Sequence, residues 1–213
     1  MIKKITLILF FTTSLVQSQI PNGYYDTATG NDYELKSQLF EIINNQIDQG
    51  YNALDDFYIT NDIDIYYEND NTILDIYSEN PSGTDPYNFS TDNSCGNYSF
   101  EGDCYNKEHI IPQSVFGSDY PMRSDAHQVI PTDGRVNGFR SAYPFGVVGQ
   151  NLVSQSGISN PTQNGSKLGN NLNEGYSIGY SNIVFEPIDE FKGDIARIYF
   201  YFITRYENLI SSW

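Results

Sequence analysis

Two short runs rich in β-forming residues, each closed by a proline, most constrain how this chain can fold. They read EHIIP at residues 108–112 and HQVIP at residues 127–131. Both are predicted to be strands. Thr132 follows as the predicted N-cap of a short helix that reaches about Ser141. The order strand, strand, helix can bring polar side chains from all three elements to one place, which suits a compact metal site.

The residues best able to carry chemistry gather in the same part of the chain. Residues 104–145 hold both histidines and three of the five arginines, together with further carboxylate and amide groups. Histidine is the most frequent general base near neutral pH, so acid–base chemistry of that kind must use this segment. The side chains in question are Glu108, His109, Arg123, Asp125, His127, Arg135, Asn137 and Arg140.

Three motifs recur in order along this segment. They are N-x-E-H-x-x-P from Asn106, D-x-H-x-x-x-P from Asp125 and V-N-G-x-R-S from Val136. Together they resemble the endonuclease I family, which are secreted or periplasmic nucleases of the ββα-metal (His-Me finger) type. FEPIDEFKGDIARIYFYFITRYE, at residues 185–207, also resembles that family's late helix. The likeness implies an α+β fold: a strand-strand-helix nuclease core with additional packing helices and long irregular loops.

The resemblance also implies roles for individual residues. Glu108 and Asn137 match the ligands of a Mg²⁺ ion, with Mn²⁺ or Ca²⁺ left open, and His109 matches the general base that deprotonates the attacking water. Magnesium prefers hard oxygen ligands and keeps several waters, so one carboxylate and one amide suffice. Adjacent strand residues point to opposite faces. A bend or bulge near Pro112 is therefore expected, to aim Glu108 and His109 at one point.

Two arginines are candidates for contact with phosphate. Arg140 follows Asn137 by three residues and shares its helix face, with a surface salt bridge as the alternative. Arg123 is a positional substitute for an arginine that several family members carry in an insertion after the E-H-x-x-P motif. His127 is expected to support the site structurally, from outside the ligand shell, with Asp125 as its partner.

The first residues predict export. Residues 1–18 have Lys3 and Lys4, an apolar run at residues 5–11 that is too short to span a membrane, and a small-residue cleavage site, as in a signal peptide. Residues 19–213 are expected to form a single domain, secreted or periplasmic and not membrane-bound. Members of the family that the chain resembles usually continue past the late helix to an N-x-N-P motif, so the chain is expected to be either a fragment or a variant shortened at its C terminus.

Cys95 and Cys104 are the only cysteines, and they bracket a glycine-containing loop. In an exported chain a disulfide between them is predicted. A zinc site that combines them with His109 and His127 is the alternative, but the spacing fits no common zinc module.

The charge distribution is unusual for a protein that binds nucleic acid. The formal net charge is −16, and residues 19–100 carry fifteen acidic side chains against one basic one, Lys36. Residues 101–213 carry eight basic against twelve acidic side chains, with the basic ones concentrated around the motifs. We infer weak global attraction for phosphate, with a local cationic patch and a divalent ion supplying the rest. Acidity that merely keeps an exported protein soluble is the simpler alternative.

The remaining elements follow from periodicity and breakers. Core-packing helices are predicted from Asn31 to before Gly50 and after Pro187, with a short helix at residues 53–58 and a strand at residues 72–78. Residues 80–97 are predicted to be a loop, and residues 150–182 an irregular excursion that could include a hairpin. Residues 62–70 read as a solvated acidic loop; calcium binding is the alternative, although the spacing is not that of an EF-hand.

These inferences converge on a secreted, Mg²⁺-dependent, sequence-nonspecific endonuclease that acts on DNA as a monomer, with RNA left open as a second substrate. A metal-dependent phosphodiesterase of small esters would use the same ligands without a long groove. The eighteen tyrosines also allow a non-catalytic carbohydrate-binding module, although dispersed tyrosines usually pack with a wet hydroxyl.

Overall fold

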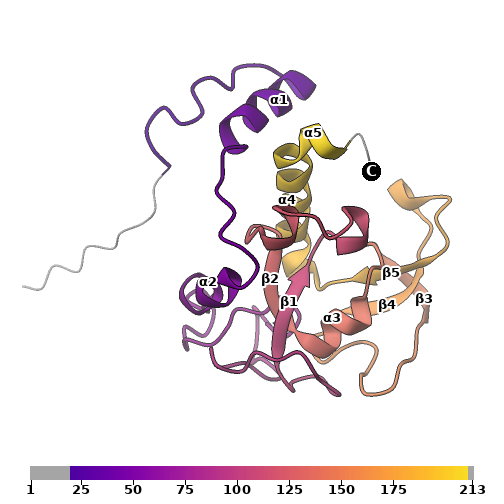
Figure 1. The fold of residues 1–213 in the computed structure, drawn as a ribbon. Coiled ribbons are helices and arrows are strands. Elements are labelled where there is room, and N and C mark those ends of the chain that lie inside the picture. Colours follow the sequence, from indigo (N-terminus) through magenta and orange to yellow (C-terminus); the bar gives the residue numbers. More distant parts are fainter. Residues whose placement is uncertain (1–19, 211–213) are drawn as a thin grey trace, which may run out of the picture.

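The computed structural model describes residues 20–210 and has an α+β fold, as predicted (Figure 1). A two-stranded ribbon stands at its centre, a three-stranded sheet lies to one side, and α helices pack around both. The predicted signal peptide lies outside the described residues. None of the helices within residues 20–210 has the length and apolar character needed to cross a bilayer.

The strand-strand-helix unit forms as predicted. β1 (Tyr105–His109) pairs antiparallel with β2 (Val129–Asp133), and α3 (Gly134–Arg140) follows directly. The register is uniform across all five pairs, so the expected bulge is absent from the ribbon and the chain bends only after His109. Thr132 is not the N-cap. Asp133 caps α3 because its carboxylate accepts the Val136 N–H at 2.7 Å.

Short 3-10 turns at Gln113–Val115 and Met122–Ser124 fill the connection between the two strands. Val129 and Tyr105 pack on one side of the ribbon against α2 (Ala53–Asn61) and Phe89. Ile110 and the inner residues of α3 belong to the main core on the other side. The ribbon therefore lies between two hydrophobic clusters, and both clusters support the polar groups at its end.

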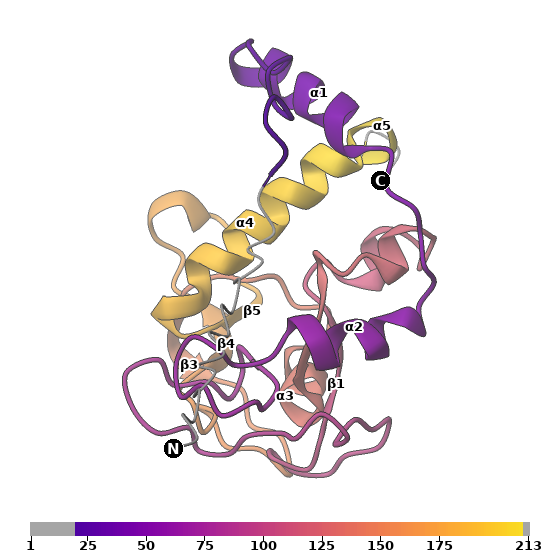
Figure 2. The same ribbon diagram turned by 90° about the vertical axis from the view of Figure 1, so that its left-hand side faces the viewer.

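The late helix is the main support of the larger cluster, as predicted. α4 (Asp189–Arg205) contributes Phe191, Ile195 and Phe202, and α5 (Glu207–Ile210) continues from it. α1 (Asp32–Ile43) lies across the C-terminal end of α4 (Figure 2). Its predicted core role is wrong, because it buries none of its residues, and Asn31 makes no side-chain cap.

Two stretches differ from the sequence prediction. Residues 150–182 were expected to be an irregular excursion that could include a hairpin. β3 (Val148–Leu152) and β4 (Lys167–Asn171) pair antiparallel there, and β5 (Ile183–Glu186) adds a third strand that was not predicted, with a 3-10 turn at Gly175–Ser177. Residues 72–78 form no strand. Within this stretch only Ile73 makes a β-bridge, an isolated one to Ile63. A turn follows, in which the Asp75 carboxylate accepts a hydrogen bond from the Tyr77 N–H.

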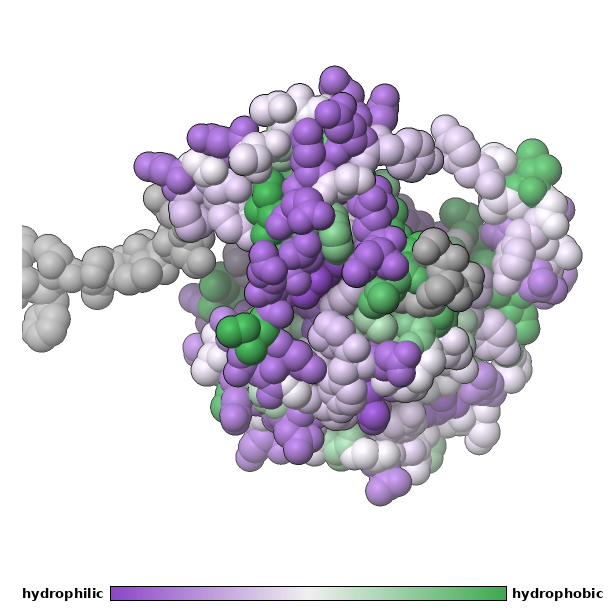
Figure 3. All heavy atoms as spheres, turned by 45° about the horizontal axis from the view of Figure 1, so that its top comes forward, coloured by the Kyte–Doolittle hydropathy of each residue, from purple (hydrophilic) through white to green (hydrophobic). Residues whose placement is uncertain are grey.

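The predicted disulfide between Cys95 and Cys104 is present, which excludes the zinc alternative. It closes the loop that precedes β1. Hydrophilic residues cover most of the face seen in Figure 3, where the hydrophobic residues are scattered in small groups. The acidic loop at residues 62–70 is only partly solvated, because Asp64 is buried.

Candidate active site

Glu108 is held inside the protein by two partners. Its side chain is 2 % exposed, and Oε1 accepts a hydrogen bond from the Tyr77 hydroxyl at 2.8 Å. The same oxygen forms a buried ion pair with Arg140 Nη1 at 3.1 Å. Burial raises the pKa of the Glu108 carboxyl, and the Arg140 guanidinium opposes that rise. A buried charge of this kind is tolerated only when it is paired.

His109, the last residue of β1, is buried among different neighbours. Its ring stacks on Tyr51 with the centroids 6.1 Å apart, and Nε2 lies 3.1 Å from the Arg123 carbonyl oxygen. A carbonyl only accepts, so Nε2 carries the hydrogen and Nδ1 keeps the lone pair. Burial lowers the pKa of the imidazole to about 4. His109 is therefore neutral at pH 7, with Nδ1 able to accept a proton.

Asn137, in α3, reaches back to β1. Its Nδ2 donates to Asn106 Oδ1 at 2.8 Å and to the Lys107 carbonyl at 3.2 Å. The second acceptor belongs to the peptide unit that joins Lys107 to Glu108. Because the amide nitrogen is fixed by two acceptors, the amide oxygen of Asn137 is also held in one orientation.

Glu108 and His109 nevertheless diverge in this structure. Glu108 contacts Tyr77 and Arg140, whereas His109 contacts Tyr51 and Arg123. The uniform pairing of β1 explains this, since neighbouring residues on a strand point to opposite faces. The structure therefore places the predicted ligand and the predicted base side by side in the chain without a bulge that aims both at one point.

The two candidate arginines have different surroundings. Arg140 is 1 % exposed, and it also donates to the His109 and Ile110 carbonyls at 2.8 and 2.6 Å. It is neither a surface salt bridge nor a group that faces solvent, and it locks the end of β1 instead. Arg123 lies with its guanidinium 5.0 Å from the Tyr51 ring centre. Within residues 20–210 the buried Nε atoms of both arginines lack a hydrogen-bond partner, so Nε does not distinguish them. The difference lies in the terminal nitrogens, because those of Arg140 are bound to Glu108 and two carbonyls whereas Arg123 packs on aromatic rings.

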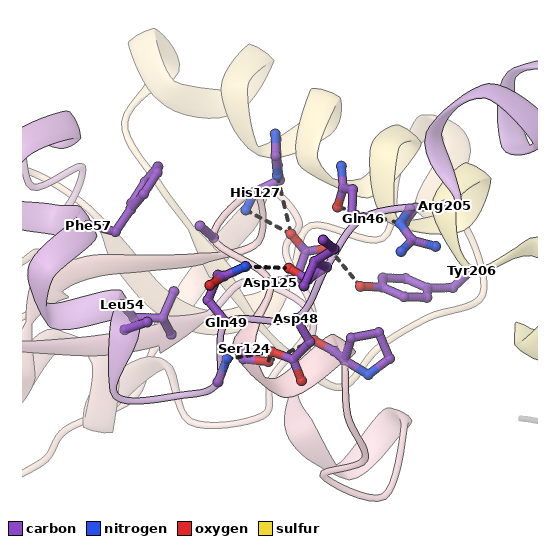
Figure 4. A pocket seen from close by; sticks show the side chains of 15 residues that line it. Gln46, Asp48, Gln49, Leu54, Phe57, Ser124, Asp125, His127, Arg205 and Tyr206 are labelled. Carbon is purple, nitrogen blue, oxygen red and sulfur yellow. Dashed lines mark hydrogen bonds and ion pairs between the residues drawn. The ribbon is translucent and has the colours of Figure 1, made fainter.

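His127 and Asp125 form a separate pair at a cavity of about 480 Å³ (Figure 4). His127 Nδ1 lies 3.3 Å from Asp125 Oδ1, and the hydrogen bond raises the pKa of His127. Asp125 Oδ2 accepts from the hydroxyls of Tyr201 and Tyr206, and the His127 ring stacks on Tyr201. The side chain of His127 is 61 % exposed, so it is no core residue. Neither Glu108, His109 nor Asn137 lines this cavity.

The donor set at Glu108 and Asn137 fits a magnesium ion. Both offer hard oxygen ligands, and the amide oxygen of Asn137 is oriented by the bonds to its nitrogen. Both side-chain hydrogen bonds to Glu108 found among the described residues end on Oε1, and the His109 N–H is a further donor to the same carboxylate. Two protein ligands leave the remaining positions to water, as magnesium sites in proteins commonly do.

Several supporting residues escaped the sequence analysis. Asn106 stands in the first motif, so a signal for it existed, but its role as the anchor of Asn137 appears only in the fold. Tyr77 and Tyr51 lie 31 and 58 residues before their partners, and nothing local marks either one. Gln113, whose Nε2 lies 3.5 Å from His109 Nδ1, was part of an unremarked connection.

An antiparallel ribbon that leads directly into a helix, with a Glu-His pair on the first strand and an asparagine on the helix, is the arrangement of the ββα nuclease class. A family model described as Endonuclease I matches residues 31–213. The chain therefore belongs to the endonuclease I family, as its motifs indicated.

Two curated relatives of the chain are extracellular ribonucleases. The chain is 28 % identical over 187 residues to the extracellular ribonuclease of Bacillus amyloliquefaciens, a match that covers 86 % of this chain and 53 % of that protein. It is also 28 % identical over 187 residues to the extracellular ribonuclease of Bacillus subtilis (strain 168), covering 86 % and 54 %. The chain thus spans about half the length of the curated relatives that it matches.

Proposed function

We propose that this chain is an exported, divalent-metal-dependent endonuclease that hydrolyses phosphodiester bonds without sequence specificity. The observation that carries the proposal is the fixed tautomer of His109, which leaves Nδ1 as a neutral base at the end of β1. Family membership supports the reaction class. Residues 19–213 would act as a single domain and as a monomer, with no membrane attachment.

His109 takes the proton of the attacking water at Nδ1. The resulting imidazolium keeps its Nε2 hydrogen on the Arg123 carbonyl, so the ring does not turn during the transfer. Tyr51 stacks on one face of the ring and fixes its plane. A general base positioned in this way contributes roughly 10²–10⁴-fold in rate.

The Glu108 carboxylate and the Asn137 amide oxygen would hold the metal. A bound Mg²⁺ supplies positive charge that stabilises the negative charge developing on the phosphate. Arg140 and Tyr77 keep Glu108 Oε1 in place, so they position the ligand without touching substrate. Since Glu108 and His109 point apart in the present structure, we infer that the end of β1 adjusts when metal and substrate bind.

Arg123 is the arginine that we assign to the substrate phosphate. It flanks the Tyr51 ring that stacks on His109. Arg140 is unsuited to this role because its guanidinium is occupied by Glu108 and two carbonyls. Lys107, the other cation near Tyr51, pairs with Asp55.

Both DNA and RNA are proposed as substrates. The resemblance to the family favours DNA, and the two relatives described as extracellular ribonucleases favour RNA. The net charge of −16 implies weak long-range attraction to either polymer, so activity should fall steeply as salt rises.

Plasmid nicking with Mg²⁺, with and without EDTA, tests the proposal. We expect nicking that EDTA abolishes and that excess Mg²⁺ restores, with RNA cleaved in parallel assays. A small chromogenic phosphodiester hydrolysed far faster than plasmid would instead indicate a phosphodiesterase of small esters. Absence of hydrolysis together with retention on a polysaccharide column would indicate a binding module.

A further inference from the structure

Three carboxylates meet in the segment of the chain between α2 and β1. Oxygens of Asp64, Glu68 and Glu79 all lie within 4.8 Å of one another. Asp64 and Glu79 are each 2 % exposed, whereas Glu68 is at the surface. The cluster therefore reaches from the interior to solvent, and an ion could enter past Glu68.

Asp64 is held rigidly in this cluster. Its Oδ1 accepts the N–H groups of Tyr66 and Tyr67, and its Oδ2 accepts those of Glu68 and Asn69, at 2.9–3.1 Å. These four bonds fix the Asp64 carboxylate at the base of the cluster.

Glu79 supplies the observation that points to a ligand. Oε1 of Glu79 is buried, and no group within residues 20–210 forms a hydrogen bond with it. Leaving a buried carboxylate oxygen unpaired is costly, and a second carboxylate nearby adds repulsion. No group within the described residues relieves this position, which favours a bound cation.

We propose that Asp64, Glu68 and Glu79 form a calcium site separate from the candidate active site. Calcium takes six to eight oxygen ligands at about 2.4 Å, so two ligands of one ion are at most about 4.8 Å apart, which this cluster satisfies. Carboxylates without nitrogen or sulfur donors disfavour zinc. Three carboxylates suit calcium better than magnesium, which demands a stricter octahedron and retains its waters.

The site would join two segments that support the candidate active site. Asp64 and Glu68 come from the acidic loop, which packs on α4 through Tyr67 and Phe191. Glu79 lies two residues after Tyr77, whose hydroxyl bonds Glu108. Calcium would therefore fix the turn that carries Tyr77, and we infer a structural role for the ion rather than a direct role in hydrolysis.

Thermal unfolding and calorimetric titration with CaCl₂ alone, on the EDTA-treated full chain without nucleic acid, test this site. We expect Tm to rise by about 5–10 °C at a calcium concentration 100 times Kd. MgCl₂ should produce a smaller rise. Because neither readout uses hydrolysis, a failure here is distinguishable from a failure of the proposed nuclease activity.

Glu68→Gln removes an exposed ligand and should fold normally, yet lose most of the calcium-dependent rise. Glu79→Gln should lose it too, and without calcium it should be at least as stable as the native protein because repulsion is removed. Glu41→Gln, an exposed glutamate of α1, is the matched control and should keep the full rise. No calcium response in the native protein, a response equal to that for Mg²⁺, or a full response in Glu68→Gln would overturn the assignment.

Discussion

Two glutamates that are equally buried show two ways in which this protein accommodates a charge. Glu108 and Glu79 are each 2 % exposed. Glu108 has Arg140 and Tyr77 on one oxygen, whereas Oε1 of Glu79 has no partner among the described residues. The protein itself compensates the first charge, and the second charge depends on what binds there. Tyr77, two residues from Glu79, connects the two regions.

Removing Arg140 should leave the Glu108 carboxylate without an ion-pair partner within residues 20–210, like that of Glu79. The resulting loss of stability is the largest effect that we expect. Arg140→Met leaves the buried carboxylate unpaired and should lower the free energy of unfolding by roughly 3–5 kcal/mol, measured by urea denaturation. Arg197→Met removes an exposed ion pair with Asp194 and should change it by less than about 1 kcal/mol. Equal effects of the two substitutions would show that the buried pair is not special.

Replacing each glutamate by glutamine should change the free energy of unfolding in opposite directions in the two regions. Glu108→Gln leaves Arg140 without its anion and should cost roughly 2–3 kcal/mol. Glu79→Gln in EDTA should instead stabilise by roughly 0–1 kcal/mol, because it removes repulsion at a partly solvated cluster. Urea denaturation of both variants in EDTA makes the comparison. Destabilisation of the same size in both would contradict the contrast.

Tyr77→Phe tests the connection between the regions. The variant removes one hydrogen bond to Glu108 and keeps Arg140, so we expect a loss of about 1 kcal/mol in unfolding free energy. Tyr176→Phe, at a fully exposed tyrosine, should change stability by less than about 0.5 kcal/mol. If Tyr77→Phe matched that control, the hydroxyl would contribute nothing to holding Glu108.

The pKa values of the two histidines should be shifted in opposite directions, and the effect on stability should be the smallest of those predicted. NMR of the metal-free protein should give His109 a pKa near 4 and His127 a pKa above 6.5. Protonated His127 then stabilises the fold below pH 6.5, and this contribution is lost as pH rises through its folded pKa. His109 acts oppositely, so its contribution is lost as pH falls from 6.5 towards 4. Two coincident pKa values near 6.5 would contradict both environments.

The parts of this structure that could be predicted from the sequence are those with a local sequence signal for a helix, a strand or a cap. The ribbon, α3 and α4 follow from β-forming runs, a cap and helical spacing, although β1 ends at His109 rather than Pro112, β2 reaches Asp133, and the cap is Asp133 rather than Thr132. A hairpin was allowed within residues 150–182, and β3 with β4 forms it, but the three-stranded sheet was not predicted because this stretch is rich in Asn, Gly and Ser and shows no clear alternation. Burial of Arg140 could not be predicted, since it depends on Tyr77 and Glu108 meeting in the folded core.

The most direct test of the central claim is the plasmid nicking rate as a function of Mg²⁺ concentration for His109→Ala and His127→Ala. His109→Ala should lower the maximal rate by roughly 10²–10⁴-fold and leave the Mg²⁺ dependence nearly unchanged, because it removes the base and neither ligand. His127→Ala should stay within about tenfold of the native rate, since His127 lies at a separate cavity beside Asp125. A nearly fully active His109→Ala protein alongside an inactive His127→Ala protein would contradict the account and place the general base at His127.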